Sequence, residues 1–179
     1  NKFLYLSPTF IPDNLETISS KYSSGTQKLV KDAKDSFEEM AKDAKSQGYT
    51  IRAISAYRSY DRQTTIYNKY VKENGLADAN TFSAKPGFSE HQTGLAVDVD
   101  NNSLSFTKFK NTKEFTWMKE NSYKYGFIIR YTDENNYITG YVKEEWHYRY
   151  VGKDIAKFIY DNKIKSYEEY YVKHIENKK

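Results

Sequence analysis

Apolar residues recur along the chain at two spacings, one typical of helices and the other typical of strands. From Thr26 to Gly48 they lie three or four residues apart, which predicts a helix that Thr26 caps and Gly48 ends. A second helix is predicted to begin at Ser59 or Asp61 and to end at Gly75. Further helices are predicted over 112–125, 152–162 and 166–177, and Ser166 and Glu169 have the spacing of a capping box.

Strands are predicted where apolar and polar residues alternate. In 94–100, Val97 and Val99 point to one face and Asp98 to the other, because successive side chains of a strand alternate. Other strands are predicted over 49–56, 127–131 and 137–142, with a turn at 133–136 that joins the last two into a hairpin, and 146–151 is expected to extend the sheet.

The remaining segments complete the expected architecture. Residues 1–25 are predicted to form an irregular N-terminal arm, and 76–93 a long polar loop of the kind that often carries function. Helices and strands are interspersed without repeats or linkers, so we predict a single α+β domain over 1–179. We expect a small antiparallel sheet flanked by helices, the last of which is assigned to 164–179.

Composition and charge narrow the functional classes. The chain has 179 residues, which suits one domain, and its 18 Tyr and 10 Phe argue against disorder despite 29% charged residues. The net charge of +4 is spread along the chain, so it indicates no nucleic-acid interface, although it suits a polyanionic surrounding such as a bacterial wall. The absence of Cys excludes disulfides, thiolate nucleophiles and zinc sites built on Cys.

Targeting signals are missing from the sequence. No apolar run is long enough to cross a membrane, and residues 1–20 lack the basic start and apolar core of a signal peptide. We therefore expect a mature or trimmed domain, with any export signal or anchor outside this chain.

Two of the three histidines lie among residues that suit a metal site. His91 ends the long polar loop, and Asp98 follows it on the polar face of the next strand. An imidazole and a carboxylate are zinc-type ligands, and a loop and the strand after it can converge on one ion. The alternative for this pair is a solvated loop histidine and a strand aspartate held by a salt bridge.

His147 supplies a third potential ligand, with Glu144 three residues earlier. Three protein ligands leave a fourth tetrahedral position for water, which zinc can activate near neutral pH. Glu144 is the candidate to take up the proton and pass it to a leaving amine. Strict alternation places Glu144 and His147 on opposite faces, so both reach one ion only if the strand ends, bends or bulges there. Otherwise Glu144 is a solvated strand carboxylate.

Arg58 follows the predicted strand 49–56 among small and aromatic residues. Its guanidinium can stabilise the oxyanion of a tetrahedral intermediate or hold a substrate carboxylate. Gln63, about one helical turn later, can add a hydrogen bond. The alternatives are an arginine stacked on Tyr57 or Tyr60 and a glutamine on the surface.

Together these segments resemble the zinc D,D- and L,D-carboxypeptidases of bacterial peptidoglycan, the VanY-type enzymes and L,D-carboxypeptidase B. Three motifs carry the resemblance, namely Tyr57-Arg58-Ser59 with Gln63, Ser89-x-His91-x-x-Gly94-x-Ala96-x-Asp98, and Glu144-x-Trp146-His147. The resemblance covers roughly residues 50–160. It implies a hedgehog/D,D-peptidase-like fold with a zinc site in a cleft on the sheet.

The resemblance also implies roles for the matching residues. One Zn²⁺ would have three ligands, namely His91, Asp98 and His147. The catalytic residues would be the general base Glu144 and the carbonyl-polarising Arg58. The substrate contacts would be Ser89, Gln63 and Trp146. The substrate would be a peptidoglycan stem peptide that loses its C-terminal D-Ala by D,D- or L,D-cleavage.

Location, oligomeric state and two alternatives follow from the same resemblance. Such an enzyme would work outside the cytoplasm, in the cell wall or anchored to the membrane through a segment outside this chain, and we expect a monomer. The alternatives are a non-catalytic zinc-stabilised wall-binding module and an endopeptidase that cuts cross-links. Glu145 departs from the family, which often has Pro between the glutamate and the tryptophan. Because Pro would fix φ at this position, its replacement by Glu145 affects the rigidity of the backbone here.

Other polar residues are assigned structural roles. Asp100 shares a strand face with Asp98 but is expected to be solvated at the strand end. His174 is expected on the surface of the last helix, and Arg149 in a structural ion pair. The Tyr-rich stretch 167–171 is interpreted as a docking surface.

Overall fold

The sheet at the centre of the molecule has four antiparallel strands. A computed structural model describes residues 2, 4–102 and 106–176. In it, the strands lie in the order β3 (Arg52–Ser55), β4 (Ala96–Asp100), β6 (Glu144–Tyr150) and β5 (Phe127–Tyr131). Each neighbouring pair is antiparallel.

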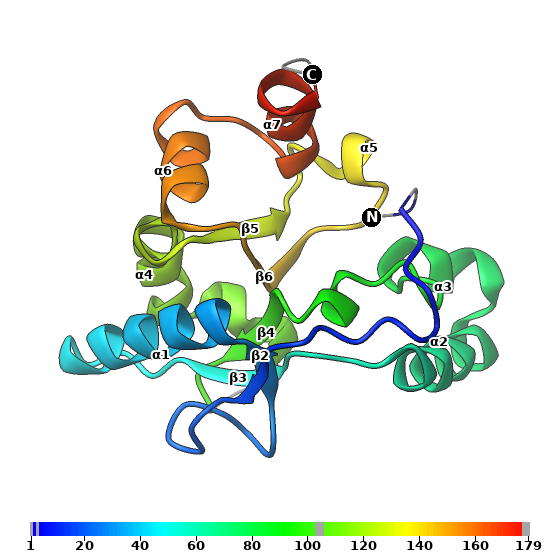
Figure 1. Cartoon of the computed structure of the whole chain (residues 1–179), viewed down its shortest axis with the longest axis horizontal. Coiled ribbons are helices and arrows are strands. Elements are labelled where there is room, and N and C mark those ends of the chain that lie inside the picture. Colours follow the sequence, from blue (N-terminus) through cyan, green and yellow to red (C-terminus); the bar gives the residue numbers. More distant parts are fainter. Residues whose placement is uncertain (1, 3, 103–105, 177–179) are drawn as a thin grey trace.

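Helices flank this sheet. In Figure 1, α1 (Lys31–Ser46), α4 (Lys113–Asn121) and α6 (Lys153–Asp161) lie to its left, while α2 (Tyr60–Asn74) and α3 (Leu76–Phe82) lie to its right. The remaining α-helices of the described residues are α5 (Asn136–Thr139) and α7 (Tyr167–His174), and 3₁₀ turns cover Glu90–Thr93, Phe106–Asn111 and Ser122–Tyr125. No helix in the described part of the chain is long and apolar enough to cross a membrane. The predicted α+β fold, with a small antiparallel sheet flanked by helices, is confirmed.

The hydrophobic core lies between helices α1 and α4 and one face of the sheet. Buried side chains from both layers form it, among them Phe37, Met40, Trp117, Val97, Val99 and Tyr148. Successive side chains of a strand point to opposite faces, so Asp98 and His147 extend from the same strands away from this core. Packing of the apolar face therefore fixes the direction of the polar side chains on the other face.

A second sheet of two short strands replaces part of the predicted arm and of the predicted first helix. β1 (Leu15–Thr17) pairs antiparallel with β2 (Lys28–Val30), and α1 begins only at Lys31. The prediction of a helix capped by Thr26 was therefore wrong at its start. Leu29 is fully buried in the core, and the backbone N–H of Val30 donates to the carbonyl of Gly94 at 2.9 Å. These non-local contacts outweigh the helical spacing of the apolar residues.

The N-terminal arm forms hydrogen bonds with the segment that precedes β4. The backbone N–H of Leu6 donates to the carbonyl of Gly87 at 2.7 Å. The buried side-chain amide of Gln92 donates to the carbonyls of Ser7 at 2.8 Å and of Phe10 at 3.2 Å. Within the predicted arm, β1 is the regular element of the described residues, and the residues before it contact the segment that precedes β4. Residues 1 and 3 lie outside the described residues.

Two further segments differ from the predictions. Residues 76–93 contain α3 and a 3₁₀ turn instead of a continuous loop; Ala79 is the one buried residue of α3, so this helix shows no periodic apolar face. Residues 137–142 are not a strand, because α5 covers the first half of them and Gly140, with φ of +75°, ends that helix. The predicted hairpin was therefore wrong, since β5 pairs with β6 instead.

Two of the helix starts that the sequence indicated are confirmed by capping hydrogen bonds, those at Ser59 and Ser166. The hydroxyls of Ser59, Thr112 and Ser166 each accept a backbone N–H at the start of α2, α4 and α7. The last helix is shorter than the predicted 164–179, because α7 ends at His174, and 177–179 lie outside the described residues.

Candidate active site

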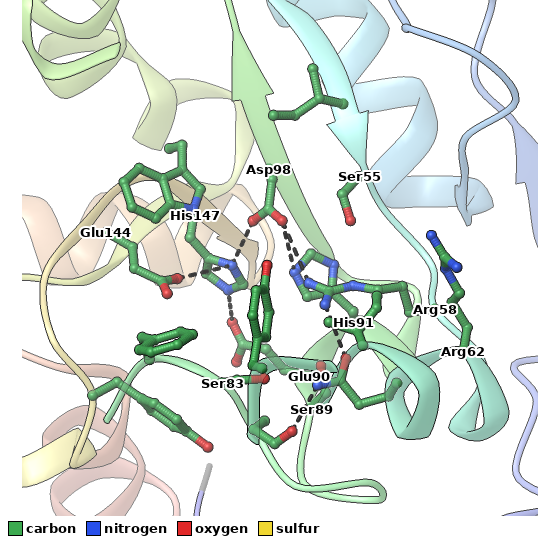
Figure 2. A pocket seen from close by; sticks show the side chains of 18 of the residues that line it. Ser55, Arg58, Arg62, Ser83, Ser89, Glu90, His91, Asp98, Glu144 and His147 are labelled. Carbon is green, nitrogen blue, oxygen red and sulfur yellow. Dashed lines mark hydrogen bonds and ion pairs between the residues drawn. The ribbon is translucent and has the colours of Figure 1, made fainter. Parts of the chain in front are cut away.

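A cleft of about 950 Å³ opens on the polar face of the four-stranded sheet. Side chains from the end of β3, from α2, from the turn before β4, from β4 itself and from β6 meet in it, as Figure 2 shows. All eight predicted site residues line this cleft, namely Arg58, Gln63, Ser89, His91, Asp98, Glu144, Trp146 and His147. The fold thus brings together three motifs that are far apart in the sequence.

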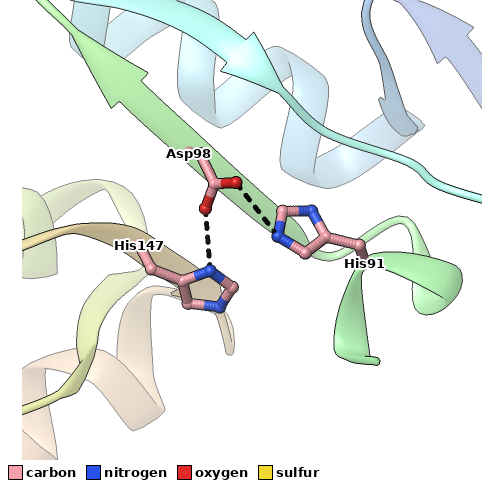
Figure 3. Close-up of side chains that lie close together, drawn as sticks. All are labelled: His91, Asp98 and His147. Carbon is pink, nitrogen blue, oxygen red and sulfur yellow. Dashed lines mark hydrogen bonds and ion pairs between the residues drawn. The ribbon is translucent and has the colours of Figure 1, made fainter. Parts of the chain in front are cut away.

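Three potential metal ligands converge at one end of the cleft. His91, Asp98 and His147 each offer one donor atom, and these atoms lie within 4.8 Å of one another. Figure 3 shows Asp98 between the two imidazoles, with Oδ2 3.3 Å from Nε2 of His91 and Oδ1 2.8 Å from Nδ1 of His147. Asp98 faces His147 directly because these residues are partners in the β4–β6 register.

The protonation of His91 shows that this donor set fits a metal ion. Its Nδ1 lies 2.7 Å from the carbonyl oxygen of Ala56, which can only accept, so Nδ1 carries the proton. Nε2 is then a buried lone pair without a hydrogen-bond partner. Burial and the charge of Arg58 lower the pKa of His91 and favour the neutral ring. A lone pair that faces the carboxylate of Asp98 suits a cation between them, and this N,O donor set matches zinc.

The electrostatics of Asp98 and His147 also favour a cation. Burial disfavours the charge of Asp98, yet the two neighbouring imidazoles hold the pKa of this carboxyl well below its usual range. Burial likewise opposes the charge of His147, but hydrogen bonds to Asp98 and Glu90 raise the pKa of His147 to about 10. The surrounding carboxylates therefore favour positive charge between these side chains, and a divalent cation supplies it.

An irregularity in the sheet brings Glu144 to the same place. Ile129 of β5 pairs with Tyr148 of β6, but Tyr131 pairs with Glu144, so a step of two residues along β5 corresponds to a step of four along β6. This register shift is the kind of bulge that the sequence required for Glu144 and His147 to approach each other. Oε2 of Glu144 lies 3.7 Å from Nδ1 of His147. Burial raises the pKa of Glu144 to about 7, a value suited to accepting and releasing a proton.

Arg58 lies on the other side of Asp98 from Glu144 (Figure 2). Its Nη2 is 3.5 Å from Oδ2 of Asp98, and its Nη1 donates to Oε1 of Gln63 at 3.0 Å. The amide nitrogen of Gln63 donates to the carbonyl of Ala84 at 2.7 Å, so both ends of this amide are engaged within the protein. Gln63 therefore orients Arg58, and a direct contact of Gln63 with substrate stays a prediction.

Ser89 and Trp146 also line the cleft, Ser89 just before the turn that carries His91 and Trp146 on β6. Their contacts with a substrate stay predictions. Glu145 is buried but is not part of the cleft lining, and its carboxylate lies 3.9 Å from Nζ of Lys143.

Asp100 and His174, which were assigned structural roles, each contact residues close to them in the sequence or on a neighbouring helix. Asp100 accepts a hydrogen bond from the backbone N–H of Asn102 at 2.9 Å and so stabilises the turn after β4. His174 is half-buried on α7, a helix without a fully buried residue, and its ring packs against Phe158 and Tyr170 at centroid distances of 4.9 and 5.2 Å.

Glu90 is a residue of the site that was not predicted from the sequence. Its carboxylate lies 2.7 Å from Nε2 of His147 and accepts hydrogen bonds from Arg130 and Arg149. The ion pair with Glu90 confirms the predicted structural role of Arg149. Its position between Ser89 and His91 was the signal in the sequence that could have indicated a role for Glu90. A single carboxylate in a polar segment is, however, usually exposed to solvent, so this position alone did not identify it.

Comparisons with known proteins extend these observations. Residues 26–153 match the family model VanY, described as D-alanyl-D-alanine carboxypeptidase, and this span includes all eight predicted site residues. The Bacillus subtilis protein YodJ is 47% identical over 148 residues, which cover 81% of this chain and 54% of YodJ. The chain spans about half the length of the curated relatives it matches.

Two solved structures show the same fold. The L,D-carboxypeptidase LdcB is 41% identical with a TM-score of 0.87, and the match covers 97% of this chain and 84% of LdcB. A mutant of the D,D-pentapeptidase VanY from a VanB-type resistance cassette, in complex with Zn(II), is 32% identical with a TM-score of 0.76. That match covers 93% of this chain and 96% of VanY.

Proposed function

Because the chain belongs to the VanY family of D-alanyl-D-alanine carboxypeptidases, we propose that it is a zinc-dependent carboxypeptidase of bacterial peptidoglycan. Its substrate is a stem peptide, from which it releases the C-terminal D-Ala. It acts as a monomer outside the cytoplasm, in the cell wall or anchored to the membrane through a segment outside this chain.

One observation carries this proposal: three zinc-type donors converge at the end of an open cleft, between a carboxylate and a guanidinium. The donors are His91, Asp98 and His147, and the flanking groups are Glu144 and Arg58. Structural zinc sites are normally closed by four protein ligands, whereas three ligands with an accessible fourth position are typical of catalytic sites. The arrangement therefore favours hydrolysis over a zinc-stabilised binding module.

Zinc held by these residues would polarise the scissile carbonyl and make water nucleophilic at neutral pH. Glu144 accepts the proton of the attacking water on its carboxylate and then donates it to the amine nitrogen of the departing D-Ala. Burial supports both steps, because it raises the pKa of Glu144 to about 7. A carboxylate with an ordinary pKa would accept the proton less readily.

Arg58 supplies the positive charge on the substrate side. Its guanidinium donates hydrogen bonds to the carbonyl oxygen as negative charge develops there, or to the terminal carboxylate of the peptide. Gln63 holds Nη1 of Arg58 at 3.0 Å, so the guanidinium is oriented before substrate enters. A preoriented donor stabilises the transition state without a cost of reorganisation.

The substrate has two versions that use the same atoms of the enzyme. A D,D-enzyme cuts the D-Ala-D-Ala bond of a pentapeptide, and an L,D-enzyme cuts a tetrapeptide between the L-centre of the diamino acid and D-Ala. The relatives include both types, LdcB as an L,D-carboxypeptidase and VanY as a D,D-pentapeptidase. The two versions differ in the stereocentre that lies next to the scissile bond.

The test is incubation of the zinc-loaded protein with synthetic tetra- and pentapeptides, followed by mass spectrometry. Loss of one D-Ala from either peptide, abolished by a chelator and restored by zinc, is the expected result. The peptide that reacts identifies the D,D- or L,D-version. Zinc binding without release of D-Ala from either peptide contradicts the proposal and supports a binding module, whereas cleavage within cross-linked peptides supports an endopeptidase.

A further inference from the structure

Behind the three metal ligands, a cluster of buried charges connects His147 to the C-terminal helix α7. Glu90 lies at its centre with a side chain only 6% exposed, and its Oε2 accepts hydrogen bonds from Nε of Arg130 and Nη1 of Arg149, both at 3.1 Å. Arg130 in turn forms a bidentate ion pair with Glu168 of α7, with Nη1 3.0 Å from Oε2. Two carboxylates and two guanidinium groups thus balance each other, as buried charges require.

The other carboxylate oxygen of Glu90 is directed at His147. Oε1 lies 2.7 Å from Nε2 of His147. The guanidinium groups of Arg130 and Arg149 both donate to Oε2 of the same carboxylate, so Glu90 lies among donors and acts as a hydrogen-bond acceptor. Nε2 of His147 therefore carries the proton of this hydrogen bond.

This hydrogen bond decides which nitrogen of His147 is left for a metal. With Nε2 engaged by Glu90, a metal ion can replace only the proton on Nδ1, the atom that lies 2.8 Å from Oδ1 of Asp98. The lone pair of His91 is directed at the other oxygen of the same carboxylate, at 3.3 Å. In metal sites generally, the hydrogen bond made by one imidazole nitrogen fixes the orientation of the ring and the identity of the metal-binding atom.

We propose that Glu90 is a positioning residue that holds His147 with Nδ1 toward the zinc, and that Glu168 of α7 holds Glu90 in place through Arg130. The inference rests on the zinc site of the proposed function. It adds a contribution from α7, which lies after residue 153, where the match to the family model ends. The C-terminal helix is thereby part of the support of the metal site.

The first test uses the unmodified protein and therefore does not depend on the folding of any variant. Nitrogen-15 NMR of the zinc-loaded, histidine-labelled chain distinguishes the two tautomers of each imidazole. The expected spectrum shows His147 protonated at Nε2 and metal-bound at Nδ1. A spectrum with zinc on Nε2 of His147 overturns the inference but leaves the proposed function intact. A chain that binds no zinc contradicts the proposed function itself.

The second test measures zinc affinity by competition with a chelator. Glu90→Gln should weaken zinc binding by about 10–100-fold, the usual effect of losing such a hydrogen-bond partner, and should shift the Nε2–H signal of His147. Glu168→Gln should weaken it less. Glu169→Gln is the control on the same helix, because the carboxylate of Glu169 contacts Lys165 and Lys173.

The outcomes separate positioning from general destabilisation. Unchanged zinc affinity and an unchanged His147 signal in folded Glu90→Gln would overturn the role of Glu90. An equal effect of Glu168→Gln and Glu169→Gln would overturn the contribution of α7 through Arg130. If Glu90→Gln does not fold, the tautomer in the unmodified chain and the comparison of Glu168→Gln with Glu169→Gln decide the inference.

Discussion

Replacement of Glu144 by Gln separates proton transfer from metal binding. Glutamine keeps the size of the side chain and can hydrogen-bond to water, but it cannot accept a proton. The three donor atoms within 4.8 Å of one another come from other residues, so zinc content and substrate binding should stay near those of the unmodified protein. Only the catalytic step should change.

The size of the effect follows from the position of Glu144. Its carboxylate lies 3.7 Å from His147, and burial raises its pKa to about 7, the value expected of a working general base. A positioned acid–base group contributes about 10²–10⁴-fold in rate. Since each factor of ten corresponds to about 1.4 kcal/mol, Glu144→Gln should raise the activation free energy by about 3–5 kcal/mol.

The assay measures kcat and KM for D-Ala release, with zinc content determined on the same samples. Glu145→Gln is the matched control, because Glu145 is the next residue of β6 but lies outside the cleft lining. We expect kcat to fall in Glu144→Gln with little change in KM, and Glu145→Gln to change activity little. A damaging Glu145→Gln beside an active Glu144→Gln would refute the assignment, and loss of zinc in Glu144→Gln would make Glu144 a ligand.

Three further predictions concern the metal, the substrate and the core. His91→Ala should lose tightly bound zinc and activity together, and stoichiometric zinc by elemental analysis in this variant would exclude His91 as a ligand. Amidation of the C-terminus of the stem peptide should abolish cleavage, because Arg58 then faces no carboxylate; equal rates on both peptides, measured by mass spectrometry, would favour an endopeptidase. Phe37→Ala should lower the free energy of unfolding in urea by about 3–5 kcal/mol, because Phe37 is fully buried in the core; a loss of less than about 1 kcal/mol would contradict its place there.

The sequence predicted those features whose causes are local. Ser59 caps α2 and Ser166 caps α7 because a hydroxyl next to a helical turn binds the free N–H groups of that turn. The alternation in β4 placed Asp98 opposite Val97 and Val99, and the structure has this arrangement. The candidate site was predictable for the same reason, since its residues belong to short motifs.

The features that the sequence did not predict depend on distant partners. Tyr137 and its neighbours alternate like a strand, but the side chain of Asn135 binds the backbone of Arg130 and Lys165 and favours a turn and a short helix there. Glu90 has the pattern of a solvated carboxylate until Arg130 and Arg149 are seen to surround it. Pairings of this kind become visible only in the folded chain.

The contacts of the N-terminal arm limit how far the chain can be truncated from its N-terminal side without loss of structure at the metal site. Ser7 and Phe10 are the hydrogen-bond acceptors for the amide of Gln92, the neighbour of His91 in the chain. A gene trimmed to the matched span 26–153 would encode every candidate ligand but would leave that buried amide without its acceptors. Such a fragment would lose the two hydrogen bonds that hold Gln92 beside His91, although it would keep every metal-binding atom. Expression vectors for crystallisation or inhibitor screening should therefore retain the codons that precede residue 26, where the match to the family model begins.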